Sequence, residues 1–479
     1  MKTMEKKDAI VVGCGGSGSA AALTLAKGGA KVVVFEKMAA PGGSTNFVEG
    51  IYAADSEMQR RRNIKASRDE GFRQLMEYSH WKANSALVRA IVDKSAGTIS
   101  WLQQEGVEFA EPSADWLGGP RVWHLLKGFG DTLVKVLVEN AIKNGVEIHY
   151  ETRARQLQRN GEGKVTGVIV EDNNGNRTKV DGKVVIIASG GYANNAEWIK
   201  KYICYDLGVN IFPLGDYDKR GDGIEMAWSV GAAEEGTNVV IWSIGAPPDV
   251  GLLSHMLGAV GQPTLWINQN GVRFCDETVI ENMIHTGNIM SRQPGGYCYR
   301  IFDADTVAYW AEYGGIGVGM YLPPTTRFTN LEAEFKTAVE ENNPYRFVAE
   351  SLDELADKMG VDRATFRRTV ENYNGYCEKG HDDEFGKDPL YLRPVRTPKL
   401  YAVKCYIDFI ATVGGIRINE KTEVLDKNNR MIPGLYAVGC DAGGMYGDSY
   451  DIYASGIGSS FAINSGRLAG ENALKFMGM

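Results

Sequence analysis

The sequence predicts an α/β protein with a Rossmann-like dinucleotide-binding fold, and two observations near the N-terminus carry that prediction. First, the apolar run 9–12 enters a glycine-rich turn at 13–18, and small residues follow the turn as they would in a helix. This order of strand, G-x-G-x-x-G turn and helix is the context that dinucleotide binding requires. Second, the apolar run 31–35 ends at Glu36, roughly 20 residues after the turn, where an acid can hold the hydroxyl pair of a ribose.

Each glycine of the turn has its own physical task. Gly13 permits the tight turn, Gly15 lets the backbone approach a pyrophosphate, and Gly18 lets the helix pack closely on the strand. The helix N-terminus then presents unpaired N–H groups and a positive dipole end to the phosphates. A plain tight turn is the alternative, but two strands, a helix and an acid in register favour a dinucleotide site.

Length and composition predict more than one domain and exclude several classes of partner. A chain of 479 residues exceeds one ordinary domain, so two domains or one interrupted domain are expected. The net charge of −8 disfavours nucleic acid and anionic membrane surfaces as partners. Seven cysteines without a C-x-x-C pair disfavour an iron–sulfur cluster, a structural metal site and a disulfide framework, and favour a reducing compartment. Because no apolar stretch approaches about 18 residues and no signal-peptide core is present, we expect no membrane span and a cytoplasmic location.

The region up to about residue 150 continues with a glycine turn, helices and a strand. The turn at 41–46 suggests a ligand longer than a mononucleotide, with an ordinary surface loop as the alternative. Charged and apolar positions that interleave at a spacing of three to four predict mostly helix over 56–108. A further helix is expected over 132–143, and a short strand over 146–150.

Residues 152–240 predict a ribbon and then a return to the parallel sheet. Apolar runs on either side of the turn-rich segment 172–176 indicate an antiparallel ribbon over 152–186. The buried strand 184–188 stops at the small residues 189–192, which would place backbone beside a ligand at the carboxyl edge of the sheet. Residues 220–223 are expected to open a helix that runs through Ala227 and is closed by Gly231.

From about 240 to 404 the composition changes, because aromatic residues and prolines become frequent and no second strand–turn–helix fingerprint occurs. This region is our candidate substrate domain, inserted into the nucleotide domain. The last 75 residues again resemble the nucleotide domain, with an apolar strand at 434–439 and a glycine turn at 455–458 that leads into a helix over 459–473. A helix N-terminus at that turn suits a ligand end that develops negative charge.

An ordered set of motifs closely resembles the soluble fumarate reductase / 3-ketosteroid dehydrogenase flavoprotein superfamily. The motifs are Gly13–Gly18, Glu36-Lys37, Gly42-Gly43-Ser44, Ala188-Ser189-Gly190-Gly191-Tyr192, Gly221-Asp222-Gly223, Asn270–Glu277, Ile301-Phe302-Asp303 and Pro433–Gly439. The resemblance implies FAD rather than NAD. It implies a Rossmann-like, glutathione-reductase-like FAD-binding domain at 1–240 and 405–479, with an inserted α+β capping domain at 241–404.

The resemblance also implies how the cofactor is held. The cofactor-binding residues predicted on this basis are Gly13, Gly15, Ser17, Gly18, Glu36, Lys37, Gly42, Gly43, Ser44, Thr45, Ala154, Ala188, Gly190, Gly191, Asp222, Gly439, Asp441, Gly456 and Ile457. Relatives in membrane complexes attach the flavin covalently to a histidine just after the second glycine turn. Ser44-Thr45-Asn46 stands there, so we expect noncovalent FAD. The fused haem and FMN-carrier domains of other relatives have no counterpart here, so a separate electron donor or acceptor is expected.

The sequence departs from the dicarboxylate reductases at three anchoring positions. No arginine follows Ile301-Phe302-Asp303 at short range, Ile410-Ala411 replaces the histidine before the Thr-x-Gly-Gly turn, and Tyr453 stands at the position of a C-terminal arginine. Each charge-assisted hydrogen bond lost in this way is worth roughly 1.5–3 kcal/mol. Fumarate is therefore not the expected substrate.

The segment Tyr453-Ala454-Ser455-Gly456 instead resembles the tyrosine–glycine element of 3-ketosteroid dehydrogenases. The resemblance implies that the Tyr453 hydroxyl and the Gly456 N–H bind a ketone oxygen, as an oxyanion hole would. Hydride would pass between flavin N5 and the carbon β to the carbonyl, while a proton moves at the α carbon. A packed core tyrosine is the alternative for Tyr453.

The proton carrier is expected in the capping domain. Glu281 follows Glu277 at the spacing at which ketosteroid dehydrogenases carry a tyrosine, and Tyr309 is a second candidate. A solvated helix residue is the alternative for Glu281, and His285 and Arg292 are rivals nearby. Seven aromatic residues of the cap fit an apolar cleft, with core packing as the alternative: Trp242, Trp266, Tyr297, Tyr299, Tyr309, Trp310 and Tyr321.

The sequence thus predicts an FAD-dependent oxidoreductase that reduces or forms a C=C bond α,β to a carbonyl in a small hydrophobic substrate, such as an enone or a ketosteroid. The direction of the reaction is not encoded in the motifs. One alternative is a reductase of an unsaturated carboxylate, such as an arylacrylate, anchored by Arg121, Arg273 or Arg292. The other is a noncatalytic flavin electron carrier.

Overall fold

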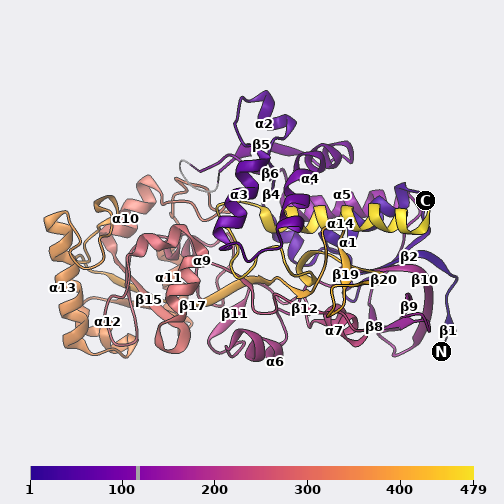
Figure 1. Ribbon diagram of the computed structural model, residues 1–479. Helices are drawn as coiled ribbons and strands as arrows, with labels where there is room; N and C mark the ends of the chain where they lie inside the picture. The colour runs from indigo at the N-terminus through magenta and orange to yellow at the C-terminus, as the bar shows by residue number, and fades with distance from the viewer. Residues whose placement is uncertain (1, 115–118) are drawn as a thin grey trace. The chain divides into compact units, whose positions relative to one another are not determined.

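Contacts between residues divide the chain into two units in the computed structural model, which describes residues 2–114 and 119–479 (Figure 1). The first unit comprises Met1–Cys204, Gly215–Ile241 and Ile410–Met479. The second unit comprises Tyr205–Leu214 and Trp242–Phe409.

A mostly parallel sheet organises the first unit, with strand order β19-β20-β10-β2-β3-β7. The strands β2, β3, β7, β10 and β20 run parallel to their neighbours, and β19 pairs antiparallel with β20. The strand bounds are β2 Lys7–Val12, β3 Val32–Phe35, β7 Glu147–His149, β10 Arg177–Ile187, β19 Glu423–Leu425 and β20 Met431–Ala437. Because these parallel strands end at one edge, the segments that follow β2, β3, β10 and β20 meet there.

Helices α1 (Gly16–Lys27) and α14 (Ile457–Met477) pack against each other beside this sheet (Figure 1). A Cβ built on Gly466 would lie 2.2 Å from the backbone oxygen of Ser17, so the two helices approach more closely than a larger residue would allow. Helix α5 (Phe129–Lys143) contacts α1 as well, and the three helices share one core with the sheet. The α/β prediction with a Rossmann-like domain is confirmed.

The predicted helical region 56–108 folds as three helices with well-formed N-termini. Ser56 and Ser67 each form a capping box, and the Asn84 side chain accepts hydrogen bonds from the first turn of the third helix. The bounds are α2 Glu57–Arg61, α3 Arg68–Tyr78 and α4 Ser85–Gln104. A small antiparallel sheet accompanies them, with strands β4 Gly50–Tyr52, β5 Phe109–Ser113 and β6 Trp123–Leu126.

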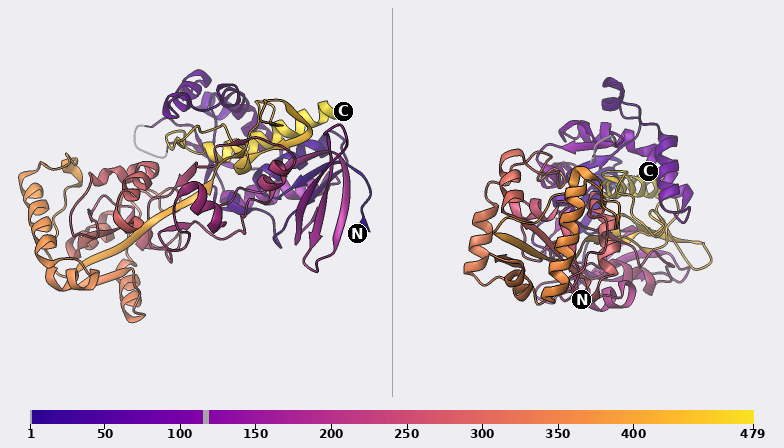
Figure 2. Two further views of the ribbon diagram at one scale, coloured as in Figure 1. Left: turned by 60° about the horizontal axis from the view of Figure 1, so that its bottom comes forward. Right: turned by 90° about the vertical axis from the view of Figure 1, so that its left-hand side faces the viewer.

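The predicted ribbon of residues 152–186 consists of β8 (Thr152–Arg159), β9 (Val165–Asp172) and the first half of β10 (Figure 2, magenta strands). The second half of β10 pairs with β2 in the parallel sheet, so this strand belongs to both the ribbon and the parallel sheet. Helix α7 (Asp222–Ser229) contacts β8. The remaining elements of this unit are β1 Lys2–Thr3, α6 Ala196–Trp198, β12 Glu234–Glu235 and β18 Gly415–Ile416.

The second unit is an α+β fold around the 13-residue strand β17 (Leu400–Thr412), whose last three residues continue into the first unit. Strands β15 and β16 pair antiparallel with β17, and β11 pairs parallel with it. The strand bounds are β11 Ile211–Pro213, β14 Leu265–Ile267, β15 Tyr297–Asp303 and β16 Arg346–Ala349. Strand β13 (Val240–Trp242) also pairs with β17 and crosses the boundary between the two units. The helices are α8 His255–Val260, α9 Met283–Ser291, α10 Ala304–Tyr313, α11 Leu331–Glu340, α12 Leu352–Met359 and α13 Arg363–Lys379. Among the described helices of both units, none combines the length and the apolar character that crossing a membrane requires.

A buried cluster of charges holds the second unit together. Arg273 donates to Glu277 and to Asp382 at 2.8 Å, and Lys387 lies 3.1 Å from Glu277. All four side chains are at most 1% exposed. The cluster ties the segment after β14 to the segment after α13. Arg273 is therefore fully engaged in structural ion pairs, which removes it from the candidate anchors of a substrate carboxylate.

We expect Arg273→Met to lower the free energy of unfolding by about 3–5 kcal/mol, because it leaves buried carboxylates without their cation. The matched control is Arg367→Met, which breaks an ion pair with Asp353 between half-exposed side chains and should cost less than about 1 kcal/mol. Urea unfolding followed by circular dichroism measures both. Equal losses in the two variants would contradict a structural role for the buried cluster.

Candidate active site

The glycine-rich turn between β2 and α1 is shaped by close backbone contacts. Gly13 has φ +106°, and a Cβ at this residue would lie 2.2 Å from the Ala188 oxygen. A Cβ on Gly18 would lie 2.0 Å from the Gly13 oxygen. Both positions therefore require glycine, as the fingerprint predicts. Ser17 lies in the first turn of α1, and a Cβ on Gly439 would lie 2.7 Å from its hydroxyl oxygen.

Glu36 follows β3 with its carboxylate held beside this turn. Oε2 accepts a hydrogen bond from the Cys14 N–H at 2.7 Å, and Oε1 accepts one from the Met38 N–H at 2.9 Å. Each carboxylate oxygen retains further acceptor capacity, which two ribose hydroxyls could use. The arrangement fits the predicted role of Glu36 in a dinucleotide site.

The second glycine turn lies against the first. The Gly42 N–H donates to the Cys14 oxygen at 3.0 Å, and the Gly16 N–H donates to the Thr45 hydroxyl at 3.0 Å. Gly42 and Gly43 both have positive φ, +125° and +55°, and Gly43 begins a short 3-10 helix (Gly43–Phe47). The structure therefore brings the two predicted cofactor turns together, which favours one extended ligand over an unrelated surface loop.

A buried lysine that was not predicted from the sequence reaches the second turn. Lys219 Nζ donates to the Ser44 hydroxyl at 2.7 Å, and burial lowers the pKa of the lysine. The sequence gives no signal for Lys219, because it lies in no motif and its partner Ser44 is 175 positions away in the chain.

Asp441 stabilises the loop that follows β10. One of its oxygens accepts from the Ser189 hydroxyl at 3.0 Å and from the Gly191 N–H at 2.8 Å, and the other accepts from the Gly190 N–H at 3.0 Å. Burial raises the pKa of Asp441. Three hydrogen bonds from this carboxylate position the loop, and the expected cofactor contact of Asp441 stays a prediction.

Lys37 and Asp222 form part of one ionic cluster. Lys37 Nζ lies 2.7 Å from the Asp222 carboxylate, and Arg153 donates to the other Asp222 oxygen at 2.9 Å. Arg153 precedes the predicted residue Ala154, which is 5% exposed on β8. No sequence signal marks Arg153, since it lies in an ordinary ribbon strand.

The C-terminal glycine segment places Tyr453 and Gly456 at the start of α14. Gly456 is the N-cap of the helix with φ +80°, and its oxygen accepts from the Tyr52 N–H at 3.0 Å. The Tyr453 ring packs edge-on against Tyr78, with ring centroids 6.1 Å apart. Ile457, the first residue of the helix, is fully buried.

Asp451 was not predicted, yet it holds Tyr453 in place. Its carboxylate accepts from the Tyr453 N–H at 2.8 Å and from Gln74 of α3 at 3.0 Å. Asp451 is 2% exposed, and burial raises the pKa of its carboxyl to about 6. The buried Tyr52 hydroxyl has no hydrogen-bond partner within the described residues. Its pKa is raised mainly by burial and to a smaller extent by the negative charge of Asp451. The one sequence signal that could have indicated this role is the position of Asp451, two residues before Tyr453.

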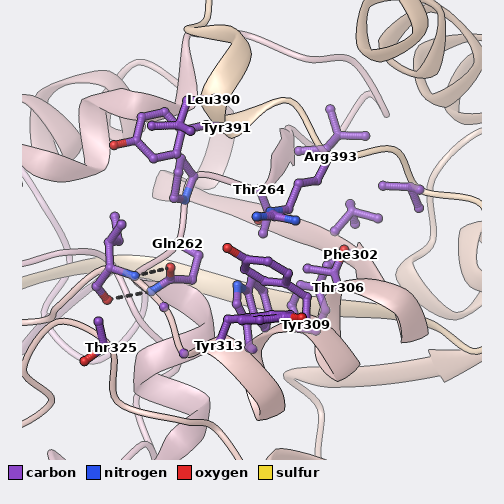
Figure 3. A pocket seen from close by; sticks show the side chains of 18 residues that line it. Gln262, Thr264, Phe302, Thr306, Tyr309, Tyr313, Thr325, Leu390, Tyr391 and Arg393 are labelled. Carbon is purple, nitrogen blue, oxygen red and sulfur yellow. Dashed lines mark hydrogen bonds between the residues drawn. The ribbon is translucent and has the colours of Figure 1, made fainter.

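The other two predicted catalytic residues, Glu281 and Tyr309, lie in the second unit and are linked to one cavity. The cavity has a volume of about 290 Å³ and lies wholly within that unit (Figure 3). Tyr309 lines it from α10, and so does Tyr391, whose hydroxyl donates to Glu281 at 3.2 Å. The Arg393 guanidinium lies 3.5 Å from the centroid of the Tyr309 ring. Glu281 itself is exposed.

The aromatic residues expected to form an apolar cleft divide between this cavity and the core. Tyr309 and Trp310 line the cavity. Trp266 is fully buried beneath Arg300, and the buried Tyr299 donates to the Met359 oxygen at 2.7 Å, so these two residues serve packing. Of the rivals, Arg292 is exposed and Arg121 donates to the Pro112 oxygen at 3.0 Å. Burial lowers the pKa of His285.

The family model described as "FAD binding domain" matches residues 8–457. The chain belongs to this family. It is 36% identical over 480 residues to a vinyl phenol reductase of Lactiplantibacillus plantarum, covering 98% of this chain and 96% of the relative. It is 29% identical to an NADH:fumarate oxidoreductase of Klebsiella pneumoniae, covering 98% of this chain but 48% of that protein.

Solved structures show the same fold. The open conformation of a flavocytochrome c3 fumarate reductase aligns with a TM-score of 0.75 at 24% identity, over 99% of this chain and 79% of that one. A 3-ketosteroid Δ1-dehydrogenase from Sterolibacterium denitrificans aligns with a TM-score of 0.81 at 19% identity, over 98% of this chain and 100% of that one. The superfamily prediction is confirmed, and the cofactor is FAD. The chain is an FAD-dependent oxidoreductase that acts on C=C bonds, as predicted.

We expect Glu36→Gln to weaken FAD binding about tenfold, because a neutral amide makes weaker hydrogen bonds to ribose hydroxyls than a carboxylate does. Titration of the apoprotein with FAD measures the dissociation constant. Glu162→Gln, in the exposed turn between β8 and β9, is the matched control. Identical FAD affinity in the two variants would remove Glu36 from the cofactor site.

Asp451 should make the protein less stable as the pH rises from about 4 to about 6. Its folded-state pKa lies above the ordinary value of 3.8, so the folded protein binds more protons in this window and loses stability as the pH rises through it. Asp451→Asn removes this contribution, which a shift of about two pKa units sets at about 3 kcal/mol. Urea unfolding at pH 4 and pH 7 tests this expectation. A variant with the same pH dependence as the wild type would show that Asp451 does not titrate in this way.

Proposed function

We propose that the protein reduces the C=C bond of a small, uncharged alkene that is conjugated to an oxygen, with a vinylphenol as the first substrate to test. The observation that carries this proposal is the site around Tyr453, where a neutral hydroxyl and a buried acid stand in place of a cation. The relative that matches nearly end to end, a vinyl phenol reductase, supports the same substrate class. Enones share the electronic feature, and they are the wider class predicted from the sequence.

The polarity of the first unit favours an uncharged substrate over a carboxylate. The described segment 448–458 around Tyr453 contains no lysine or arginine. Of its two acids, Asp448 forms an ion pair with Lys82, whereas Asp451 accepts only from neutral donors. Asp451 is buried and, with a pKa of about 6, is largely ionised at neutral pH. A substrate carboxylate placed beside it would lose solvation and meet a like charge, both of which cost free energy.

The chemistry follows from conjugation between the oxygen and the double bond. Reduction adds a hydride to one alkene carbon and a proton to the other, and bound FAD supplies the hydride chemistry. In an enone the carbonyl oxygen takes the developing negative charge. In a 4-vinylphenol the hydroxyl gives its proton to solvent water, and the oxygen pushes electrons toward the terminal carbon, which takes a proton from the proton carrier. The benzylic carbon then accepts hydride, and the oxygen regains its proton.

Tyr453 and Gly456 are proposed to act on that oxygen. A phenolic O–H and a backbone N–H are neutral donors, and they stabilise a charge that develops during the reaction without binding an anion tightly in the ground state. Asp451 is proposed to position Tyr453 through the backbone N–H it accepts. Glu281 and Tyr309 stay candidates for the proton carrier, and the electrons are proposed to come from a separate donor.

The test is reoxidation of the anaerobically reduced holoenzyme, followed by the visible absorbance of the flavin. We expect rapid reoxidation by 4-vinylphenol and slow reoxidation by styrene, which lacks the oxygen, and by fumarate. Tyr453→Phe should slow reoxidation by 4-vinylphenol about 100-fold, the usual cost of losing one oxyanion donor. Tyr376→Phe on α13, outside both candidate sites, is the control variant. Reoxidation by fumarate alone, or a Tyr453→Phe rate equal to the control, would overturn the proposal.

A further inference from the structure

The cavity of the second unit has features of a ligand site in its own right. It has a volume of about 290 Å³, at the small end of ligand pockets, so it suits a ligand smaller than a typical drug. Aromatic side chains make up much of its wall: Phe302, Tyr309, Trp310, Tyr313 and Tyr391. The rings of Tyr309 and Tyr313, one turn apart on α10, have centroids 5.1 Å apart. Such walls favour a planar aromatic ligand.

Most polar side chains in the wall already have partners inside the protein. Gln262 accepts from the Ile316 N–H at 2.9 Å and donates to the Ile316 oxygen at 3.0 Å (Figure 3). The Thr306 hydroxyl donates to Asp303 at 2.9 Å, and the Tyr391 hydroxyl donates to Glu281 at 3.2 Å. These groups shape the cavity and have less capacity left for a ligand.

Thr264 and Arg393 are among the polar groups of the wall that have no such partner in the described part of the chain. Thr264 lines the cavity and is 8% exposed. Its hydroxyl is buried and has no hydrogen-bond partner within the described residues. A buried hydroxyl without a partner costs free energy, and a hydrogen-bonding ligand in the cavity would recover it. Arg393 lines the same cavity and forms no ion pair with any carboxylate among residues 2–114 and 119–479.

The position of Arg393 fits recognition of an anion. Its guanidinium lies over Tyr309, 3.5 Å from the ring centroid, so it is held by a cation–π contact rather than by a carboxylate. That contact orients the planar fork and leaves its N–H groups for another acceptor. A fork of this kind matches a carboxylate, which can accept two parallel hydrogen bonds.

We propose that this cavity binds a small aromatic carboxylate of the size of benzoate or cinnamate. The ring packs against Tyr309 and Tyr313, the carboxylate pairs with Arg393, and the Thr264 hydroxyl donates to an oxygen of the ligand. The proposal concerns binding in a cavity of the second unit, whereas Tyr453 and Gly456 belong to the first unit, and it does not require the reaction proposed for those two residues.

Isothermal titration calorimetry on the oxidised, FAD-loaded protein tests the proposal. The ligands are benzoate, its neutral analogue benzamide, and cyclohexanecarboxylate, which keeps the charge but loses the aromatic ring. We expect benzoate to bind about tenfold or more tightly than either analogue, because each analogue lacks one of the two recognised features. Equal binding of benzoate and benzamide would overturn the assignment to a carboxylate.

Variants locate the binding. Arg393→Met should remove the preference for benzoate over benzamide, and Arg393→Lys should keep part of it, since the charge stays while the planar fork is lost. Thr264→Val, which is nearly isosteric, should weaken benzoate about three- to tenfold. Arg396→Met is the control, because Arg396 lies three residues further on, pairs with Glu378 and does not line the cavity.

Benzoate affinity that is unchanged in both Arg393→Met and Thr264→Val would overturn the proposal, and so would an equal loss in Arg396→Met. If Arg393→Met does not fold, Arg393→Lys and Thr264→Val decide the question. Reoxidation by 4-vinylphenol is followed in parallel, so a failure of the proposed reaction is seen separately from a failure of this site.

Discussion

The first unit depends on close backbone approach at the carboxyl edge of its parallel sheet. A side chain at Gly13 would meet the oxygen of Ala188, and one at Gly466 would meet the oxygen of Ser17. These contacts bring together β2 and α1 from the N-terminal end, β10 from the interior of the sequence and α14 from the C-terminal end. The C-terminal segment returns to this edge as well, where β20 pairs with β10. The unit is therefore built from segments that are discontinuous in sequence.

Buried charge serves two purposes in this protein. In the second unit, Arg273 and Lys387 balance Glu277 and Asp382 within hydrogen-bond distance, so the cluster is neutralised and acts as a structural clamp. In the first unit, Asp451 has no cationic partner among the described residues and keeps only neutral donors, and its pKa rises accordingly. A buried acid without a cationic partner does not stabilise the fold. Its presence beside the predicted catalytic residue Tyr453 is therefore more consistent with a role in function.

The two units also differ in the charge they offer a small molecule. The segment around Tyr453 offers neutral donors and an acid, whereas the cavity of the second unit offers an uncommitted guanidinium above an aromatic wall.

Those parts of the protein that depend on local chain geometry could be predicted from the amino-acid sequence. The glycine fingerprint, the acid after the second strand, the second glycine turn and the final helix were all predicted, because turns, caps and buried strands require particular residues at short spacing. The meeting of distant side chains, in contrast, emerged from the three-dimensional structure. Lys219 reaches Ser44, Asp451 holds Tyr453 with the help of Gln74, and Arg393 lies over Tyr309. The structure also places Arg273 in buried ion pairs and Trp266 in the core. These outcomes could not be predicted because each depends on which of many equivalent polar or aromatic residues the fold brings within contact distance, and residue spacing along the chain does not record that.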